Sequence, residues 1–537
     1  ARVELGEAFK VTAQVFIEGR TKAGATVSVR NTRGTEKGRF PMTCTNPGLD
    51  RWEAMVKIGD HSDLKPWEDG YADVKKQLGE WHIVVEGWED TYASWLHDAQ
   101  IKVEVGDDAE NALESGAQLL ERWAGARDSK LTADDKKTLR EAAKTVADKS
   151  LDATARLAAA TTDAIASLHE TNPLRDGLSA SNPQRFRVER PKSSFAAWYQ
   201  FFPRSEGAYF DADGKIVQGT LKTALSGLDR AKAEGFDIVY LPPIFPIGVT
   251  NRKGRNNTLI AGPHDPGSPF GIGSELGGHD TVDPLLGTMD DFKAFCAHAH
   301  KLGIEVALDF ALQCSPDHPW VKQHPNWFRT KPDGTIAFAE NPPKKYQDIY
   351  PIDFNADMEG IEAEVERIMD LWVKAGVTIF RVDNPHTKPV RFWQDVIAAV
   401  TKKHPETLFL AEAFTRPGMM RALSYAGFTQ SHCYFPWRNT KEELEEYLEE
   451  TNTFWPSTPD IMTAYLRDNG IAGHAVRAVL AAMGSPSWGI YNGYELIENK
   501  QRPGFEEQID NEKYEVKVRD WDEADKYGIS ELLTSLN

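Results

Sequence analysis

The first 106 residues alternate apolar and polar side chains with a period of two. The pattern runs through the segments VTAQVFIEG, ATVSVRN, WEAMVKIG, WHIVVEGWED and AQIKVEVGD, which Gly, Asn or Asp residues separate. A period of two places successive side chains on opposite faces of a strand, and turn residues between such runs indicate antiparallel pairing. We therefore predict an N-terminal β-sandwich over residues 1–106.

The next stretch, residues 107–182, changes to a helical period. The segments AENALESGAQLLERWAGA, TADDKKTLREAAKTVADKS and LDATARLAAATTDAIASLHE are rich in Ala and repeat apolar residues three or four positions apart. This spacing places apolar side chains on one face of a helix. Thr132 stands where its hydroxyl could cap the second helix. We predict a small helical bundle here.

From about residue 190, short apolar runs alternate with amphipathic segments such as MDDFKAFCAHAHKLG and EGIEAEVERIMDLWVKAG. We interpret seven runs as strands, at 196–202, 236–243, 304–310, 377–383, 407–414, 430–435 and 486–493. Repeated strand–helix units of this length predict an α/β fold, a (β/α)8 TIM barrel over residues 183–537. A long stretch after the third strand, at about 313–354, predicts an insertion into the barrel.

Charged residues stand at the carboxyl ends of three of these predicted strands. Asp309 ends the third strand and Glu412 the fifth, while Arg381 and Asp383 end the fourth, two residues apart and so on one face. Asp460 follows in a later loop, FWPSTPD. Each carboxylate alone is consistent with an ion pair or a helix cap. The ordered set favours a catalytic site, because barrel enzymes carry their chemistry at the carboxyl ends of the strands.

Two of these carboxyl groups can divide the work of a retaining glycosidase. A carboxylate held ionised by a neighbouring arginine can act as a nucleophile. A desolvated carboxyl group beside another negative charge keeps its proton and can donate it. We therefore expect Arg381 to hold Asp383 ionised, Asp383 to form a glycosyl ester, and Glu412 to act as acid and base.

Longer motifs resemble known enzymes. FRVD, then AEAF, then an Asp in a later loop, all following LDF, resemble the ordered motifs of the α-amylase superfamily. NRKGRNNTL, GSPFGIGSELGGHD, LDFALQCSPDHPW, ENPPKKYQDIYP, FRVDNPHTKP and FLAEAFTRP resemble the α-1,4-glucan:maltose-1-phosphate maltosyltransferases. The resemblance runs through nearly the whole chain and implies a β-sandwich with a helical insertion before the barrel. Family members continue into a C-terminal β-sandwich, which we expect to be absent from this chain.

The resemblance implies that a maltosyl unit passes from α-maltose 1-phosphate to the non-reducing end of an α-1,4-glucan, with release of inorganic phosphate. Asp383 and Glu412 would have the roles given above, and Asp460 would stabilise the transition state. The residues that would bind the donor are Lys253, Gln313, Lys344, Tyr346 and Asn384 around its phosphate, with Arg381 beside the nucleophile. Lysines and neutral donors suit a phosphate that is bound and then released. The resemblance implies no metal ion and no organic cofactor.

Some departures from the family pattern concern the site. Gln313 and Cys314 stand where amylase-like enzymes carry Asn-His, and Gln200 stands where Glu is expected. The segment between Thr440 and Asp460 is several residues short. The first departure places a neutral amide at a predicted donor contact.

The composition bears on the partners and the cell compartment of the protein. A net charge of −19 argues against non-specific binding of nucleic acid. The absence of CxxC spacing favours free thiols in a reducing cytoplasm, and the cysteines are Cys44, Cys296, Cys314 and Cys433. No apolar run reaches the ~18 residues of a membrane span, and the N-terminus shows no signal-peptide pattern. We expect a bacterial cytoplasmic enzyme of α-glucan (glycogen) synthesis without nucleic-acid or membrane partners, and the resemblance implies a homodimer.

Two other functions stay open. The same carboxylates could hydrolyse α-1,4-glucans with water as the acceptor, although the predicted phosphate contacts argue against this. A non-catalytic glucan-binding protein could keep the fold, although the presence of Arg381, Asp383 and Glu412 argues against it.

Overall fold

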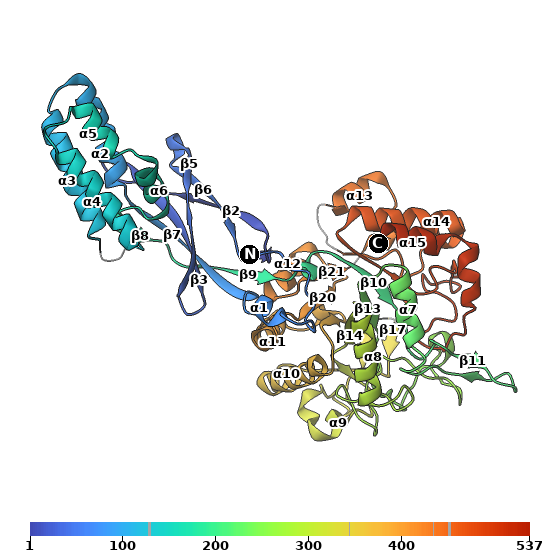
Figure 1. Ribbon diagram of the computed structural model, residues 1–537. Coiled ribbons are helices and arrows are strands. Elements are labelled where there is room, and N and C mark those ends of the chain that lie inside the picture. The colour runs from blue at the N-terminus through green and yellow to red at the C-terminus, as the bar shows by residue number, and fades with distance from the viewer. Residues whose placement is uncertain (127–129, 343, 433, 449–452) are drawn as a thin grey trace. The chain divides into compact units, whose positions relative to one another are not determined.

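The computed structural model describes residues 1–126, 130–342, 344–432, 434–448 and 453–537 (Figure 1). The chain divides into two compact units. Unit 1 consists of Ala1–Ser62 and Gln77–Glu189, and unit 2 of Asp63–Lys76 and Arg190–Asn537. The predicted division into three parts, with boundaries after residues 106 and 182, stays a prediction.

The described part of unit 1 forms two β-sheets. The strands are β1 Arg2–Glu4, β2 Ala8–Gln14, β3 Ala23–Asn31, β4 Glu36–Pro41, β5 Thr43–Asn46, β6 Arg51–Lys57, β7 Gly79–Glu89, β8 Asp176–Ala180 and β9 Gln184–Glu189. One sheet has the order β1-β9-β7-β3-β4 with β8 beside β7, and the other has the order β2-β6-β5. These pairs are antiparallel except for β1 and β9. The rings of Phe9 and Phe186 join the two sheets, with centroids 5.4 Å apart.

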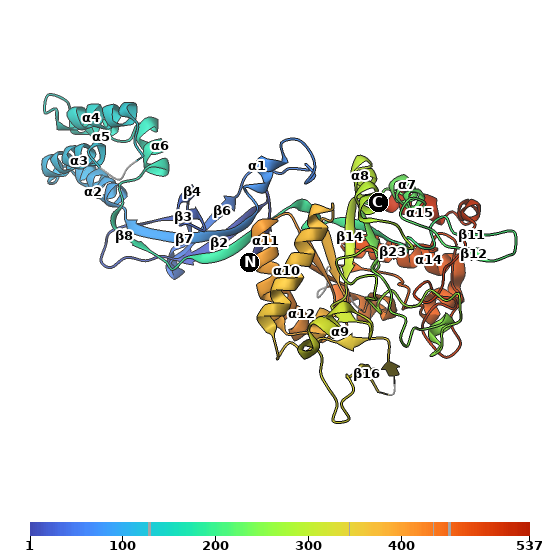
Figure 2. The ribbon, with the colours of Figure 1, turned by 90° about the horizontal axis from the view of Figure 1, so that it is seen from below.

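The helices of unit 1 follow β7 and gather at one end of β3 and β7, as Figures 1 and 2 both show. They are α2 Thr91–Val105, α3 Ala109–Ala124, α4 Ala133–Ala147, α5 Ala153–Ala159 and α6 Asp163–Thr171. The cap predicted at Thr132 is confirmed. Its hydroxyl accepts a hydrogen bond from the Asp135 N–H at 3.1 Å, and the Asp135 carboxylate accepts one from the Thr132 N–H at 2.8 Å.

One strand prediction in unit 1 is wrong. Residues 99–107, AQIKVEVGD, belong largely to α2, which begins where the Asp90 carboxylate accepts a hydrogen bond from the Ala93 N–H at 2.9 Å. Ile101 and Val105 are four residues apart, a spacing that fits one face of a helix as well as one face of a strand. They are 49% and 71% exposed. The capped helix decides between the two periods, and these apolar side chains lie on its solvent face.

Unit 2 is built around a closed barrel of parallel strands. In chain order they are β10 Ala196–Gln200, β13 Ile238–Leu241, β14 Glu305–Phe310, β19 Ile379–Val382, β20 Leu408–Glu412, β21 Gln430–His432, β22 Thr453–Phe454 and β23 Ser487–Tyr491. The predicted barrel is confirmed, and each of the seven predicted runs contains a strand. Strand β22 is not among the predicted runs, because two residues are too few to show a periodicity.

Helices surround these strands, and Figure 1 shows α7, α8, α10 and α11 outside the barrel. The helices of the barrel are α7 Leu225–Ala233, α8 Met289–Lys301, α10 Met358–Lys374, α11 Val390–Lys403, α12 Pro417–Ala426, α13 Lys441–Leu448, α14 Ala464–Gly484 and α15 Ile529–Leu536. A hairpin, β11 Tyr209–Phe210 and β12 Ile216–Val217, follows β10. The predicted insertion lies between β14 and α10, and its elements are β15 Gln313–Cys314, α9 Pro319–Gln323, β16 Ala339–Asn341, β17 Lys344–Tyr346 and β18 Tyr350–Pro351.

Residues 63–76 belong to unit 2, although the chain on both sides of them belongs to unit 1. We call these residues the strap. They contain the short helix α1 (Tyr71–Lys75), in which Tyr71 is buried. The Trp67 ring stacks on His300 with centroids 3.8 Å apart and an interplanar angle of 7°. The strap is therefore attached to the barrel by an aromatic contact.

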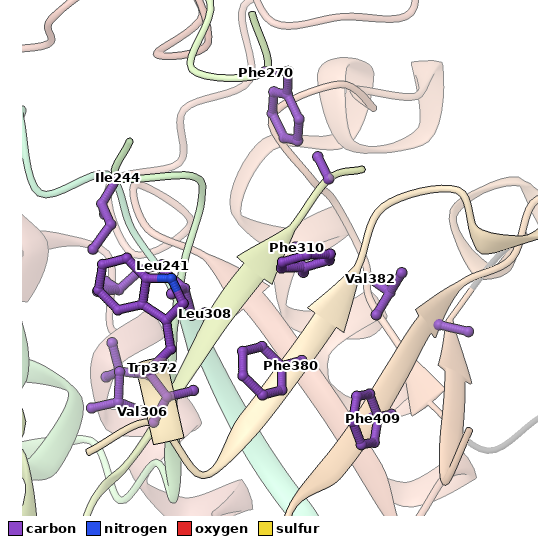
Figure 3. Packing of buried hydrophobic residues seen from close by; sticks show 14 of the residues in the cluster. Leu241, Ile244, Phe270, Val306, Leu308, Phe310, Trp372, Phe380, Val382 and Phe409 are labelled. Atoms are coloured by element: carbon purple, nitrogen blue, oxygen red, sulfur yellow. The ribbon is translucent and has the colours of Figure 1, made fainter. Parts of the chain in front are cut away.

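Side chains on the barrel strands alternate between two apolar layers. Figure 3 shows Phe310, Phe380 and Phe409 on neighbouring strands, in the layer that also contains Trp372 from α10. The Phe310 and Phe380 centroids are 6.3 Å apart, and those of Phe380 and Phe409 are 5.7 Å apart. Residues that alternate with these phenylalanines along the strands, such as Ile379 and Leu410, point the other way and belong to a second cluster inside the barrel. Its members are Ala196, Trp198, Ile238, Tyr240, Ala307, Ile379, Leu408, Leu410 and Trp455. A strand residue two positions after a member of this inner cluster therefore also points into the barrel.

Candidate active site

The strand alternation carries charged side chains to the carboxyl end of the barrel interior. Asp309, Arg381 and Glu412 each stand two residues after a side chain of the interior cluster, namely Ala307, Ile379 and Leu410. Asp309 and Arg381 are also direct neighbours in the register of β14 and β19. A period of two therefore points these groups inward together.

One guanidinium joins three carboxyl groups. Arg381 Nη1 donates hydrogen bonds to Asp309 Oδ2 and Asp383 Oδ1, each at 2.9 Å. Arg381 Nη2 also contacts Glu412 Oε1. The Arg381 side chain is 7% exposed, and the three carboxyl side chains are at most 12% exposed. The single charge of Arg381 cannot balance three carboxylates in a buried site, so we expect at least one of the three carboxyl groups to retain its proton.

Asp383 is the carboxyl group that stays ionised. Burial alone would raise its pKa, but the Arg381 guanidinium beside it lowers the pKa below the usual range. The ammonium groups of Lys388 and Lys513 lower this pKa further. An ionised carboxylate held by an arginine is the form that a nucleophile needs.

Glu412 is held in the opposite state. Burial raises the pKa of Glu412 well above its usual range, and the Asp383 and Asp460 carboxylates raise it further against the opposing effect of Arg381. A hydrogen bond between the two carboxyl groups raises the pKa of Glu412 and lowers that of Asp383, so the proton lies on Glu412. A protonated carboxyl group beside an ionised one can serve as a general acid.

Asp309, on β14, contacts the same guanidinium as Asp383 and Glu412. Its pKa is raised to about 7, foremost by burial, with Arg381 acting against the shift. The Tyr240 hydroxyl donates a hydrogen bond to Asp309 Oδ2. Asp309 therefore contacts Arg381 and Tyr240 and supports the guanidinium from the barrel side.

Asp460 borders the same site from a later loop. Arg381, Glu412 and Asp460 line one pocket, which we call the carboxylate cavity. The Asp460 carboxylate accepts a hydrogen bond from Lys513 Nζ at 2.9 Å, and this ammonium group lies 4.9 Å from the centre of the Phe270 ring. The structure thus brings the three predicted catalytic carboxyl groups into one region.

The residues after the nucleophile form a tight turn. Asn384 has a left-handed φ of 42°, which asparagine tolerates better than most residues, and its Nδ2 lies 3.4 Å from Asp383 Oδ2. Lys388 Nζ donates to the backbone carbonyls of Asp383 and Asn384, each at 3.2 Å. The turn therefore places Asn384 against the carboxylate, and Lys388 holds the turn from within.

Two of the predicted phosphate contacts are partly or fully buried. Lys253 is 2% exposed, and its Nζ donates to Gln347 Oε1 at 3.0 Å. Gln313, on β15, donates from Nε2 to the backbone carbonyl of Phe270 at 3.2 Å. Phe270 lines the carboxylate cavity. Gln313 is therefore in contact with the wall of this cavity.

The other predicted contact residues lie on β17. Tyr346 is half-buried, and its hydroxyl makes no hydrogen bond within the described part of the chain. The side chain of Lys344 lies outside the described residues. Among the described residues that line the carboxylate cavity, Lys253, Gln313 and Tyr346 are absent. Their predicted contact with a phosphate stays a prediction.

One buried group has the residue types of a metal site. The ligand atoms of His279, Cys314 and His318 lie within 4.8 Å of one another. However, the Trp320 N–H donates to His318 Nδ1, and His279 Nε2 lies 2.9 Å from the Ala311 carbonyl. The remaining ring nitrogens, His279 Nδ1 and His318 Nε2, are 3.1 Å apart and can bond each other. With both rings neutral, no nitrogen lone pair is left for a cation. The absence of a metal stays a prediction.

Several residues of the site are not among the predicted ones. Tyr240, Phe270, His432 and Trp455 line the cavity. Lys513 bonds the Asp460 carboxylate, and Lys388 bonds the backbone carbonyl of Asp383. Tyr240 has a recognisable signal, because it stands near the end of a predicted strand as Asp309 does. Lys513 has none, because it lies beyond the last barrel strand in a stretch without periodicity.

Comparison with known proteins gives consistent matches over the whole chain. Residues 1–190 match the family model described as alpha-1,4-glucan:maltose-1-phosphate maltosyltransferase, domain N/S. The chain is 79% identical over 547 residues to the alpha-1,4-glucan:maltose-1-phosphate maltosyltransferase of Bifidobacterium longum, covering 100% of this chain and 73% of that protein. Identity to the protein of the same name from Bifidobacterium animalis subsp. lactis is 72% over 546 residues, covering 100% and 75%. For maltosyltransferase 1 of Streptomyces coelicolor it is 50% over 549 residues, covering 100% and 78%.

The helices in the described residues are all too short or too polar to cross a lipid bilayer.

Proposed function

This chain belongs to the family of α-1,4-glucan:maltose-1-phosphate maltosyltransferases, and from that premise we propose that it transfers maltosyl units from α-maltose 1-phosphate to the non-reducing end of an α-1,4-glucan. The observation that carries the proposal is the contact of one guanidinium, that of Arg381, with both Asp383 and Glu412. Their pKa values are shifted in opposite directions, which matches a nucleophile and a general acid.

The first step forms a covalent intermediate. An Asp383 oxygen attacks the anomeric carbon of the donor, and the bond from that carbon to the phosphate oxygen breaks. Glu412 gives its proton to the departing phosphate. The product is a β-maltosyl ester of Asp383, with inverted configuration at the anomeric carbon.

The second step returns the enzyme to its starting state. Glu412, now ionised, takes the proton of the acceptor's 4-hydroxyl group, whose oxygen attacks the anomeric carbon and displaces Asp383. Two inversions give an α-1,4 bond. Asp460 would bind sugar hydroxyls and stabilise the positive charge that develops on the sugar ring. Its place on the cavity lining supports this role.

The donor's phosphate would be bound by Lys253, Gln313, Lys344, Tyr346 and Asn384. Local cations are needed to attract an anionic donor to a chain with a net charge of −19. Lys253 supports such a local cation, because it is buried and its ammonium group contacts the neutral side chain of Gln347. We further infer that the enzyme is cytoplasmic, that it forms a homodimer and that inorganic phosphate is its second product.

Phosphate release from α-maltose 1-phosphate, with and without maltohexaose, tests the proposal. We expect release that depends on the acceptor and is lost in Asp383→Ala. The control is Asp333→Ala, an exposed aspartate on the insertion, which should behave like the parent. Sugar release from glucans without the phosphate donor would instead indicate a hydrolase. Glucan binding without any turnover in a folded parent would indicate a non-catalytic binding protein.

The covalent step can be tested separately with Glu412→Gln and α-maltosyl fluoride. Fluoride departs without a proton from the enzyme, so the first step can proceed while the second lacks its base. We expect a mass increase of one maltosyl group, located on Asp383 by peptide mapping. A label on any other residue would contradict the assignment of the nucleophile.

A further inference from the structure

Two buried histidines connect the insertion to the end of strand β14. His279 lies in the GGHD segment before α8, and His318 caps the start of α9. They are 1% and 2% exposed. The His279 ring lies against Trp320, with centroids 5.0 Å apart and an interplanar angle of 14°. The proposed reaction uses neither ring.

The hydrogen bonds assign a tautomer to each ring. The Trp320 N–H donates to His318 Nδ1 at 3.1 Å, so this nitrogen carries no proton and His318 Nε2 carries one. That N–H faces His279 Nδ1 at 3.1 Å, which must accept it. His279 therefore carries its proton on Nε2 and donates it to the Ala311 carbonyl at 2.9 Å. Burial lowers the pKa of His279 to about 4 and lowers that of His318 well below its usual value, which keeps both rings neutral.

The backbone makes room for this arrangement. A Cβ atom on Gly273 would lie 2.2 Å from the His318 ring, and one on Gly278 would lie 2.4 Å from it. Both positions therefore require glycine while the ring is in place. The backbone is therefore packed closely around the His318 ring.

The chain of hydrogen bonds ends at the turn that carries Gln313. The Ala311 carbonyl accepts from His279 Nε2 and also from the Gln313 backbone N–H, the latter at 2.9 Å. The Gln313 side chain then donates to the carbonyl of Phe270, which lines the carboxylate cavity. One carbonyl thus connects the histidines to the residue predicted to contact the donor.

We propose that His279 and His318 are a positioning pair, which holds the turn from Ala311 to Gln313 so that the Gln313 amide reaches the donor's phosphate. The inference rests on the proposed function, in which Gln313 binds that phosphate. The pair acts through Gln313, because neither ring is among the groups that line the carboxylate cavity. Its loss should therefore weaken donor binding and leave the chemical step intact.

Two substitutions of His279 separate the hydrogen bonds of the ring. In Gln, the amide nitrogen can take the place of Nε2 and still donate to Ala311. In Asn, the amide oxygen can take the place of Nδ1, but nothing reaches the carbonyl. We expect His279→Asn to raise the donor KM about tenfold and His279→Gln to raise it less than about threefold, with kcat within about twofold of the parent in both.

A double-mutant cycle tests whether the pair acts through Gln313. If it does, His279→Asn combined with Gln313→Ala raises the donor KM no more than Gln313→Ala alone. His298→Asn is the matched control: His298 is a partly exposed histidine on α8 that bonds Asp229, and its substitution should leave the kinetics unchanged. Additive effects of the two substitutions, or an equal fall of kcat and kcat/KM, would overturn the inference.

Long-range ¹H–¹⁵N spectra of the histidine rings in the full chain give a readout that does not depend on turnover. We expect both rings as Nε2–H tautomers, with the signals identified by their loss in the variants. A proton on Nδ1 of either ring, or one equivalent of bound zinc, would overturn the pair. If the tautomers are as assigned but the parent releases no phosphate from the donor, the proposed function fails, and the donor-binding part of the inference fails with it.

Discussion

Arg381 is the residue on which the candidate site depends most directly, because its flat guanidinium reaches three carboxyl groups at once. A lysine ammonium at this position is a point charge on a flexible stem and cannot reproduce that fork. We predict that Arg381→Lys lowers kcat by about 100-fold, since Asp383 loses the contact that keeps it ionised. Steady-state phosphate release measures the effect. Arg367→Lys, with a half-exposed side chain on α10, should change kcat little, and an equal loss there would refute the argument.

Asp309 gives the site a pH-dependent effect on stability. Its folded pKa is about 7, against an ordinary value of 3.8, so the folded state binds more protons than the unfolded state between these values. Raising the pH through this window therefore lowers the free energy of unfolding, and the loss is complete above about pH 7. We predict that Asp309→Asn, which cannot ionise, gains melting temperature relative to the parent as the pH rises from 5 to 8. A constant difference across this range would show that Asp309 does not titrate in the folded protein.

The position at which a helix begins is determined by its capping residues as well as by its apolar periodicity. Helix α4 begins with a reciprocal pair of hydrogen bonds between Thr132 and Asp135. We predict that Thr132→Ala costs about 1 kcal/mol and speeds hydrogen exchange of the α4 amides. Thr138→Ala, the same substitution inside this helix, removes no cap and should leave the exchange unchanged or slower. Equal effects of the two would mean that the cap contributes nothing specific.

At the scale of the whole molecule, the chain order and the compact units do not coincide, because the strap (residues 63–76) belongs to unit 2. Within the strap, the Trp67 ring stacks on His300. We predict that Trp67→Ala destabilises unit 2 by about 2 kcal/mol, while Trp67→Phe retains most of the stacking. Thermal unfolding measures both. Phe210→Ala, at a ring that is 60% exposed in the same unit, should have little effect. No loss in Trp67→Ala would show that the strap is held by its other contacts.

The sequence by itself determined the barrel, seven of its strands and the charged residues at their ends. A period of two is a local property, and it places Arg381 and Asp383 on one face of the chain without any knowledge of the fold. Local pattern failed where two periods coincide, as at residues 99–107, and where a strand has only two residues, as in β22.

Only the tertiary structure decided which groups meet across the chain. Arg381 contacts residues of two other strands, Asp309 on β14 and Glu412 on β20. Lys513 reaches Asp460 from beyond the last strand, and His279 meets His318 from another loop. These contacts join residues far apart in the sequence, and no periodicity encodes them. Burial and neighbouring charge together set the protonation of Asp383, Glu412 and the two histidines, and both depend on the packed environment and not on the residue type.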